Sequence, residues 1–182
     1  VMDELVPRVT ALALHAKAAN IPLAIDAEEA DRLDLSLDVI EAVLANVDLK
    51  SWSGFGVVVQ AYSKRCPQVI DWLYALTKSL DRKISVRLVK GAYWDAEIKN
   101  AQVLGLEGYP VFTRKESTDI SYLSNAQKLL QMTDRIYPQF ATHNAHTVAA
   151  ILDLADTMGK SPATYEFQRL HGMGEVLHKI VL

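Results

Sequence analysis

The most informative stretch of the chain is Ile84-Ser85-Val86-Arg87-Leu88-Val89-Lys90-Gly91-Ala92-Tyr93-Trp94-Asp95. Residues 86–89 within it are nearly continuous in apolar character, which is typical of a strand that is covered on both faces. A helical pattern at about 67–80 precedes it, and another at about 94–104 follows it. A strand between two helices predicts a parallel sheet, because parallel neighbours need a crossover connection.

The same alternation runs through the whole chain. Apolar runs that predict strands lie at 23–25, 57–59, 84–89, 138–141 and 164–168. Helical patterns lie at 2–19, 28–45, 67–80, 94–104, 118–132 and 145–158, with a last helix from about 174. Five alternating units predict an α/β protein, either an open doubly wound sheet or a (βα)8 barrel. No Gly-x-Gly-x-x-Gly follows a strand, so the dinucleotide-binding fingerprint is not matched.

The amino-acid composition excludes several classes of protein. The 182 residues are 50% hydrophobic and carry a net charge of −3, values that argue against disorder and against a dominant nucleic-acid surface. The single cysteine, Cys66, cannot form an internal disulfide, which favours a reducing compartment. No apolar run approaches the ~20 residues of a membrane span, and the acidic start does not resemble a secretory signal. We therefore expect a cytoplasmic protein.

Polar side chains follow each expected strand at its carboxyl end. Ligands bind at the carboxyl ends of strands in parallel sheets and barrels alike. A single polar strand end is usually a solvated loop, but five together predict one shared active site. In chain order these residues are Asp26, Glu28 and Glu29, then Gln60 and Tyr62, then 90–95, then Thr142, His143 and Asn144, and finally Gln168, Arg169 and His171.

Arg87 is the most informative single residue because it lies inside an apolar strand. Burying a guanidinium without a partner is costly, so Arg87 needs a carboxylate or an anionic ligand. Two interpretations stay open, a structural ion pair with Asp26 or a donor aimed at a cofactor or substrate. Strand alternation places Arg87, Val89 and Gly91 on one face, where Gly91 would let a flat ligand approach the backbone.

Two other motifs have both a simple and a functional interpretation. The surroundings of His143 lack the spacing of a metal site, so we expect His143 to donate a hydrogen bond to a ligand oxygen. The triplet Thr113-Arg114-Lys115 is typical of a solvated loop, but beside a ligand it would bind phosphate oxygens. A serine hydrolase is not favoured, because the Gly-x-Ser-x-Gly elbow is missing.

Six stretches, in order along essentially the whole chain, resemble the proline dehydrogenase family, and within it the bifunctional bacterial enzymes. They lie at 23–30, 58–62, 86–95, 108–115, 140–144 and 165–173. The run from Arg87 to Trp94 is the most specific of them. The resemblance implies a (βα)8 barrel with FAD at its carboxyl-end mouth. It also implies oxidation of L-proline to 1-pyrroline-5-carboxylate, with hydride transfer to the flavin.

The resemblance also implies roles for individual residues, and none of these roles involves a metal. Catalytic roles fall on Arg87, Asp26 and Tyr93, and Tyr93, Leu170 and Asp26 would contact the substrate. Cofactor contacts are implied for Gln60, Arg87, Val89, Gly91, Trp94, Thr113, Arg114, Lys115, Thr142, His143, Asn144, Gln168 and Leu170.

For partners, the resemblance implies a quinone or another membrane electron acceptor, and hence peripheral contact with the inner membrane. It implies no nucleic-acid binding through this segment, and it allows for an aldehyde dehydrogenase domain elsewhere in the parent chain. Residues 1–182 are expected to form only the middle of the barrel domain, about five βα units, because a complete barrel has ~250 residues. The strand with the family's active-site lysine would precede Val1, and the helix whose tyrosine and arginines hold the proline carboxylate would follow Leu182. We therefore expect the fragment alone to be inactive.

Two further hypotheses stay open. One is a metal-dependent barrel hydrolase or lyase that uses Asp26, His143 and Glu166. The other is a non-catalytic binding or assembly module that keeps the barrel for packing alone. Metal analysis would distinguish the first hypothesis from a flavoenzyme, and an Arg87→Met variant would distinguish the second.

Overall fold

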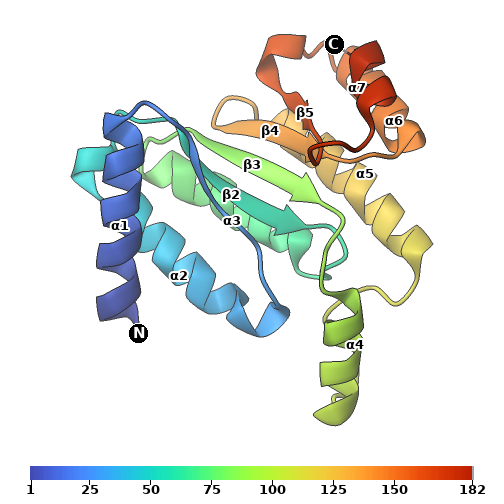
Figure 1. The fold of residues 1–182 in the computed structure, drawn as a ribbon, viewed down its shortest axis with the longest axis horizontal. Coiled ribbons are helices and arrows are strands. Elements are labelled where there is room, and N and C mark those ends of the chain that lie inside the picture. Colours follow the sequence, from blue (N-terminus) through green and yellow to red (C-terminus); the bar gives the residue numbers. More distant parts are fainter. Residues whose placement is uncertain (182) are drawn as a thin grey trace.

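In the computed structural model, which describes residues 1–181, a sheet of parallel strands is flanked by helices (Figure 1). The strands are β1 (Leu23–Ile25), β2 (Phe55–Gln60), β3 (Ile84–Val89), β4 (Ile136–Ala141) and β5 (Glu166–Gln168). The helices are α1 (Met2–Ala18), α2 (Leu33–Leu44), α3 (Cys66–Ser79), α4 (Trp94–Val103), α5 (Lys115–Gln131), α6 (Ala145–Thr157) and α7 (Glu175–Val181). Short 3-10 turns lie at η1 (Ala30–Arg32), η2 (Val47–Leu49) and η3 (Pro162–Thr164).

The strand order decides between the two predicted architectures. The strands lie side by side in the order β1-β2-β3-β4-β5, and each pair is parallel. In a doubly wound sheet the order reverses at a switch point, whereas consecutive strands are neighbours in the wall of a (βα)8 barrel. The predicted α/β class is therefore confirmed, and the topology is that of five consecutive units of a barrel wall.

Most predicted elements lie within a few residues of the observed ones, and the differences have local causes. The predicted helix over 28–45 begins only at Leu33, because the backbone N–H of Ala30 donates to the carboxylate of Glu97 and a 3-10 turn forms instead. The predicted strand over 164–168 shortens to three residues. There Ser161 caps a turn that uses residues 162–164 before the strand begins.

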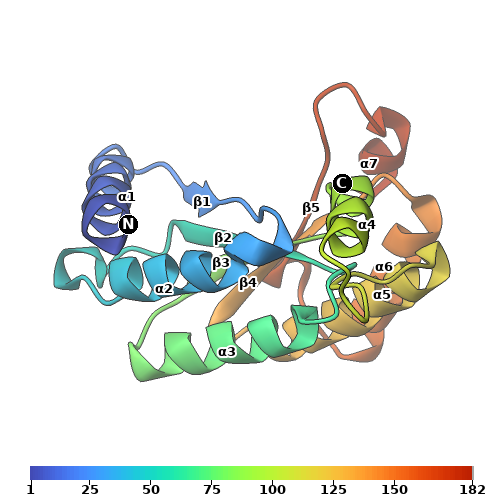
Figure 2. The ribbon, with the colours of Figure 1, turned by 90° about the horizontal axis from the view of Figure 1, so that it is seen from below.

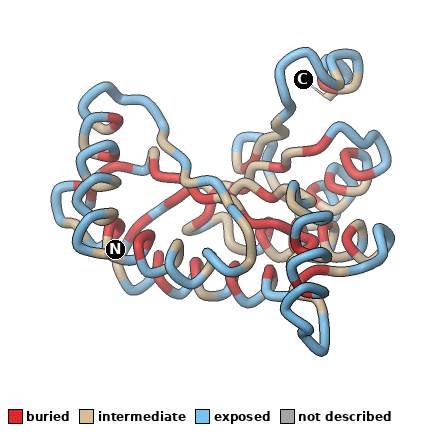
Figure 3. The backbone as a smooth tube through the Cα atoms, turned by 60° about the horizontal axis from the view of Figure 1, so that its bottom comes forward, coloured by how far each residue is buried: buried red, intermediate tan, exposed pale blue. Residues whose placement is uncertain are grey.

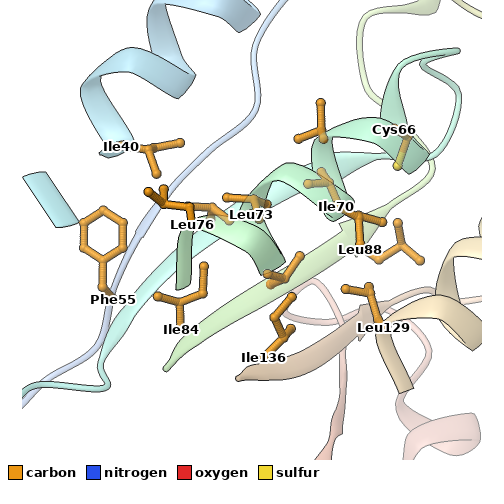
Figure 4. Packing of buried hydrophobic residues seen from close by; sticks show 14 of the residues in the cluster. Ile40, Phe55, Cys66, Ile70, Leu73, Leu76, Ile84, Leu88, Leu129 and Ile136 are labelled. Atoms are coloured by element: carbon orange, nitrogen blue, oxygen red, sulfur yellow. The ribbon is translucent and has the colours of Figure 1, made fainter. Parts of the chain in front are cut away.

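The core lies between the sheet and the helices on its outer side. Ile84, Val86 and Leu88 of β3 are fully buried, and Figure 2 shows α2, α3 and α5 below the strands. Figure 4 shows the side chains of this cluster meeting between strands and helices, with Ile70 and Leu73 contributed by α3. The buried parts of the chain in Figure 3 follow the strands and the inward sides of the helices.

The inner face of β3 differs from the prediction that both faces are covered. Ser85, Arg87 and Val89 alternate with the buried residues and are only partly buried. The predicted grouping of Arg87 with Val89 on one face is confirmed, and this face remains accessible within residues 1–181. The same described residues include no helix with the length and apolar character needed to cross a bilayer.

Candidate functional site

A cleft of about 760 Å³ opens on the inner side of the sheet, where the strands end. Its walls come from the carboxyl ends of all five strands and the loops that follow them. The sheet therefore brings together the predicted site residues Asp26, Gln60, Arg87, Val89, Gly91, Tyr93, Thr142, His143, Asn144, Gln168 and Leu170.

A second cleft of about 450 Å³ adjoins the first, since Lys90 and Gly91 line both. Trp94, Thr113 and Lys115 line this second cleft. Arg114 lines neither cleft and is an exposed residue at the N-cap position of α5. The predicted site residues are thus distributed over one elongated depression, with Arg114 at its margin.

Arg87 forms the ion pair that the sequence predicts. Its Nη2 atom lies 2.5 Å from Oδ1 of Asp26, which follows β1. The pair spans β2, where Val58 is the register neighbour of Arg87. The side chain of Arg87 is 29% exposed and that of Asp26 is 74% exposed. Because a guanidinium carries five N–H donors, this pair leaves Arg87 with donors for a ligand in the cleft.

Gln60 joins two loops of the site. Its Nε2 donates to the carbonyl oxygen of Glu28 over 2.8 Å, and its Oε1 accepts from the backbone N–H of Ala92 over 3.3 Å. Gln60 is almost fully buried. Gln60 therefore fixes the loop after β1 against the loop after β3. The predicted contact of Gln60 with the cofactor would come in addition to these two hydrogen bonds.

The backbone conformation at residue 91 and the neighbouring Tyr62 ring both require a glycine there. Its φ is +138°, a conformation that residues with side chains rarely adopt, and a Cβ atom there would lie 2.4 Å from Cδ2 of Tyr62. The Tyr62 ring packs against Gly91 and lines the second cleft, and it does not line the cleft around Arg87. Burial raises the pKa of the Tyr62 phenol to about 12, so it is neutral at physiological pH.

The turn that joins β4 to α6 is stabilised by hydrogen bonds of its side chains to nearby backbone groups. Oδ1 of Asn144 accepts from the backbone N–H of Thr147 over 3.0 Å and caps α6. Oγ1 of Thr142 accepts from the backbone N–H of Asn144 over 3.2 Å. These contacts leave the amide nitrogen Nδ2 of Asn144 for a ligand.

His143 contacts the loop after β5. Its Nε2 lies 3.0 Å from the backbone N–H of Leu170 and accepts a hydrogen bond from it. The proton of a neutral imidazole then resides on the other ring nitrogen. The predicted donor role of His143 therefore falls to Nδ1.

The two lysines that line the second cleft share one carboxylate, that of Asp119. Asp119 of α5 accepts from Lys115 over 2.7 Å and also from Lys90. These hydrogen bonds, that of Lys115 first, hold the pKa of Asp119 below its usual range, and Asp119 raises the pKa of Lys115. Two positive charges face one negative charge, so this cleft keeps an excess positive charge that suits an anionic group.

The three residues of the metal hypothesis do not converge. Asp26 pairs with Arg87, His143 accepts from Leu170, and Glu166 accepts from two glutamine amides. Within residues 1–181 no group of three or more His, Cys, Asp or Glu side chains is close enough to hold a metal ion. The observed interactions of the three residues give this hypothesis no support.

One ion pair at the site has no signal in the local sequence. Lys90, directly after β3, pairs with Asp119 of α5, and the segment between them includes α4, so no local pattern indicates the pairing. Gln139 lies outside both clefts, on the inner face of β4 with Tyr137 and Ala141, where it is the register neighbour of Arg87.

Comparisons with known proteins agree with this geometry. Residues 2–182 match the family described as proline dehydrogenase. The chain is 58% identical to the bifunctional protein PutA of Salmonella typhimurium and 57% identical to that of Escherichia coli. In both comparisons the alignment covers 100% of this chain and only 14% of the relative. A crystal structure of a Bradyrhizobium japonicum PutA mutant matches with a TM-score of 0.96 and 58% identity, over 100% of this chain and 18% of that one.

Proposed function

Because the chain belongs to the proline dehydrogenase family, which is flavin-dependent, we propose that it forms the cofactor-binding part of an enzyme that oxidises L-proline to 1-pyrroline-5-carboxylate. The observation that carries this proposal is the cleft at the five strand ends, which gathers the residues of the family pattern around Arg87. The chain spans 14% of the length of the bacterial relatives. The proposal therefore concerns the longer protein to which this segment would contribute.

The two adjoining clefts suit FAD in their donor chemistry. The cleft around Arg87 combines a guanidinium with apolar walls, which suits a flat ring system that gains negative charge. The second cleft offers Lys90, Lys115 and Thr113, which suit the phosphates of the cofactor. We propose that Gln60, Val89, Gly91, Trp94, Arg114, Thr142, His143, Asn144, Gln168 and Leu170 supply the remaining contacts.

When bound, FAD supplies the acceptor for the hydride that leaves the ring carbon beside the proline nitrogen. Arg87 contributes a positive charge that faces the cleft, and preorganised charge of this kind lowers the barrier. Asp26 orients the guanidinium of Arg87 through their 2.5 Å contact. Since Asp26 is engaged with Arg87 and mostly exposed, it is not assigned as the base, and solvent can accept the amine proton.

Tyr93 and Leu170 line the cleft from the loops after β3 and β5. We assign them the apolar wall for the proline ring. Leu170 is 64% exposed within the described residues, so its side chain is accessible to a bound molecule. Its backbone is fixed by His143, which defines the position of this wall.

For the longer protein we propose a bifunctional enzyme, since the curated bacterial relatives are named bifunctional PutA. An aldehyde dehydrogenase domain would then oxidise the product further. A quinone or another membrane acceptor would reoxidise the flavin during peripheral contact with the inner membrane, and the protein would otherwise be cytoplasmic. In this proposal residues 1–182 are the middle of the barrel.

The experiment is a turnover assay on the full-length protein with L-proline and an artificial electron acceptor dye. We expect proline-dependent dye reduction and formation of 1-pyrroline-5-carboxylate, detected with an aromatic amino-aldehyde trap. A full-length protein that contains no flavin and leaves L-proline unchanged would contradict the proposal. The isolated segment serves as the control and is expected to be inactive.

A further inference from the structure

A row of side chains crosses the inner face of the sheet at the level of Arg87. The strand register pairs Val58 with Arg87, Arg87 with Gln139, and Gln139 with Glu166. Barrel interiors are built from such layers, each formed by side chains from neighbouring strands. The proposed function gives a role to Arg87 in this layer but none to Gln139 or Glu166.

Glu166 accepts hydrogen bonds from two amides. Its Oε1 lies 2.9 Å from Nε2 of Gln139 and 2.7 Å from Nε2 of Gln168. All three side chains are partly buried. A carboxylate accepts hydrogen bonds more strongly than a neutral oxygen does. Glu166 therefore constrains the side chain of Gln168, which lines the cleft two residues farther along β5.

The constraint has a chemical consequence for the site. The two ends of an amide differ, since Nε2 only donates and Oε1 only accepts. With Nε2 of Gln168 directed at Glu166, Oε1 points away from Glu166 and accepts no hydrogen bond within residues 1–181, so it is the acceptor available to a ligand in the cleft. Without Glu166 the amide would lose the partner that fixes this orientation, and it could turn its donor end into the cleft.

We propose that Glu166 is a positioning residue of the flavin site, which fixes the amide of Gln168 so that Gln168 presents an acceptor oxygen to the bound cofactor. This inference rests on the proposed function. It assigns no contact between Glu166 and the cofactor, and the effect of Glu166 passes through Gln168 alone.

A double-mutant cycle on the full-length protein tests this inference. The measurement is FAD affinity, from fluorescence titration of the flavin-free protein with FAD. Both Glu166→Met and Gln168→Met are expected to weaken FAD binding by about tenfold, the upper end of the range for one hydrogen bond between neutral groups. The double variant is expected to bind FAD no more weakly than Gln168→Met alone does. The reason is that Glu166 affects FAD binding only through the amide of Gln168.

Two matched variants distinguish the positioning of the Gln168 amide by Glu166 from a general stabilisation of β5 by Glu166. Glu166→Gln keeps an oxygen that can accept from Gln168, so its FAD affinity is expected to remain within about threefold of the wild type. Gln139→Met removes the other hydrogen bond of Glu166 and leaves that of Gln168. Its FAD affinity is expected to be unchanged.

Fully additive losses in the double variant would overturn the inference, and so would an unchanged affinity in Glu166→Met. If Glu166→Met does not fold, Glu166→Asp replaces it, because the shorter side chain withdraws the acceptor and keeps the charge. Wild-type affinity in Glu166→Asp would equally overturn the inference. A wild-type protein that binds no FAD would overturn the proposed function itself, whereas additive losses in a flavin-binding protein overturn only the role of Glu166.

Discussion

Replacing Arg87 with methionine should remove most of the proline oxidation and leave the fold intact. The effect on stability can be worked out from the ion pair with Asp26. The two side chains are 29% and 74% exposed, and an ion pair this accessible to solvent contributes at most about 1 kcal/mol. Methionine also retains much of the apolar stem that packs on the strand.

The effect on activity should be much larger than the effect on stability. Removing one preorganised donor from a site where charge develops typically lowers the rate by about 10²–10³-fold, or about 3–4 kcal/mol. In Arg87→Met the loss is therefore expected in kcat, measured by dye-coupled proline oxidation in the full-length protein. Urea denaturation and FAD titration on the same preparation measure the stability and the cofactor content.

Asp26→Asn is the matched control for this prediction. It removes the same ion pair but keeps the guanidinium in the cleft, so its stability should fall as little as that of Arg87→Met. Its kcat should fall clearly less, since the positive charge remains. Normal proline oxidation by flavin-loaded Arg87→Met would refute the role assigned to Arg87, and equal losses of kcat in the two variants would refute the distinction between them.

Three other substitutions test the structure around the site. Gly91→Ala should destabilise the protein by about 2–5 kcal/mol in urea denaturation, because it adds a strained backbone and a clash with Tyr62; a loss below about 1 kcal/mol would contradict this. Tyr122→Phe should cost about 1–3 kcal/mol without creating a cavity, because its single buried O–H is shared between carbonyl oxygens of β3 and β4, and an unchanged unfolding midpoint would argue against it. Asp119 has a lowered pKa in the folded protein, so its stabilising effect is present at neutral pH and is lost as the pH falls below about 4. Asp119→Asn should therefore flatten the fall in stability over that acidic range, and an unchanged pH profile would contradict the pairing with the lysines.

The sequence predicted the strands well where hydrophobic periodicity was strong. The range of β3 was predicted to the residue, and so was the face that carries Arg87. The boundaries of α2 and β5 were missed because distant or turn-forming side chains compete there for backbone groups. Glu97, far along the chain, accepts from Ala30, and Ser161 caps the turn before β5.

The gathering of the site could also be predicted, because parallel strands bring their carboxyl ends to one edge. The side-chain contacts within the site could not be predicted from local patterns. Gln60 joins two loops, Tyr62 fills the space beside Gly91, and Glu166 holds two amides. Each of these contacts depends on the register and spacing of neighbouring strands, which no local pattern encodes.

The most direct test of the proposed activity is a single-turnover experiment on the purified full-length protein. L-proline is mixed without oxygen with the oxidised, flavin-loaded protein, and the visible flavin absorbance is followed. The proposed function predicts bleaching by L-proline that is much slower in Arg87→Met. A flavin absorbance that L-proline does not change in the wild-type protein would contradict it.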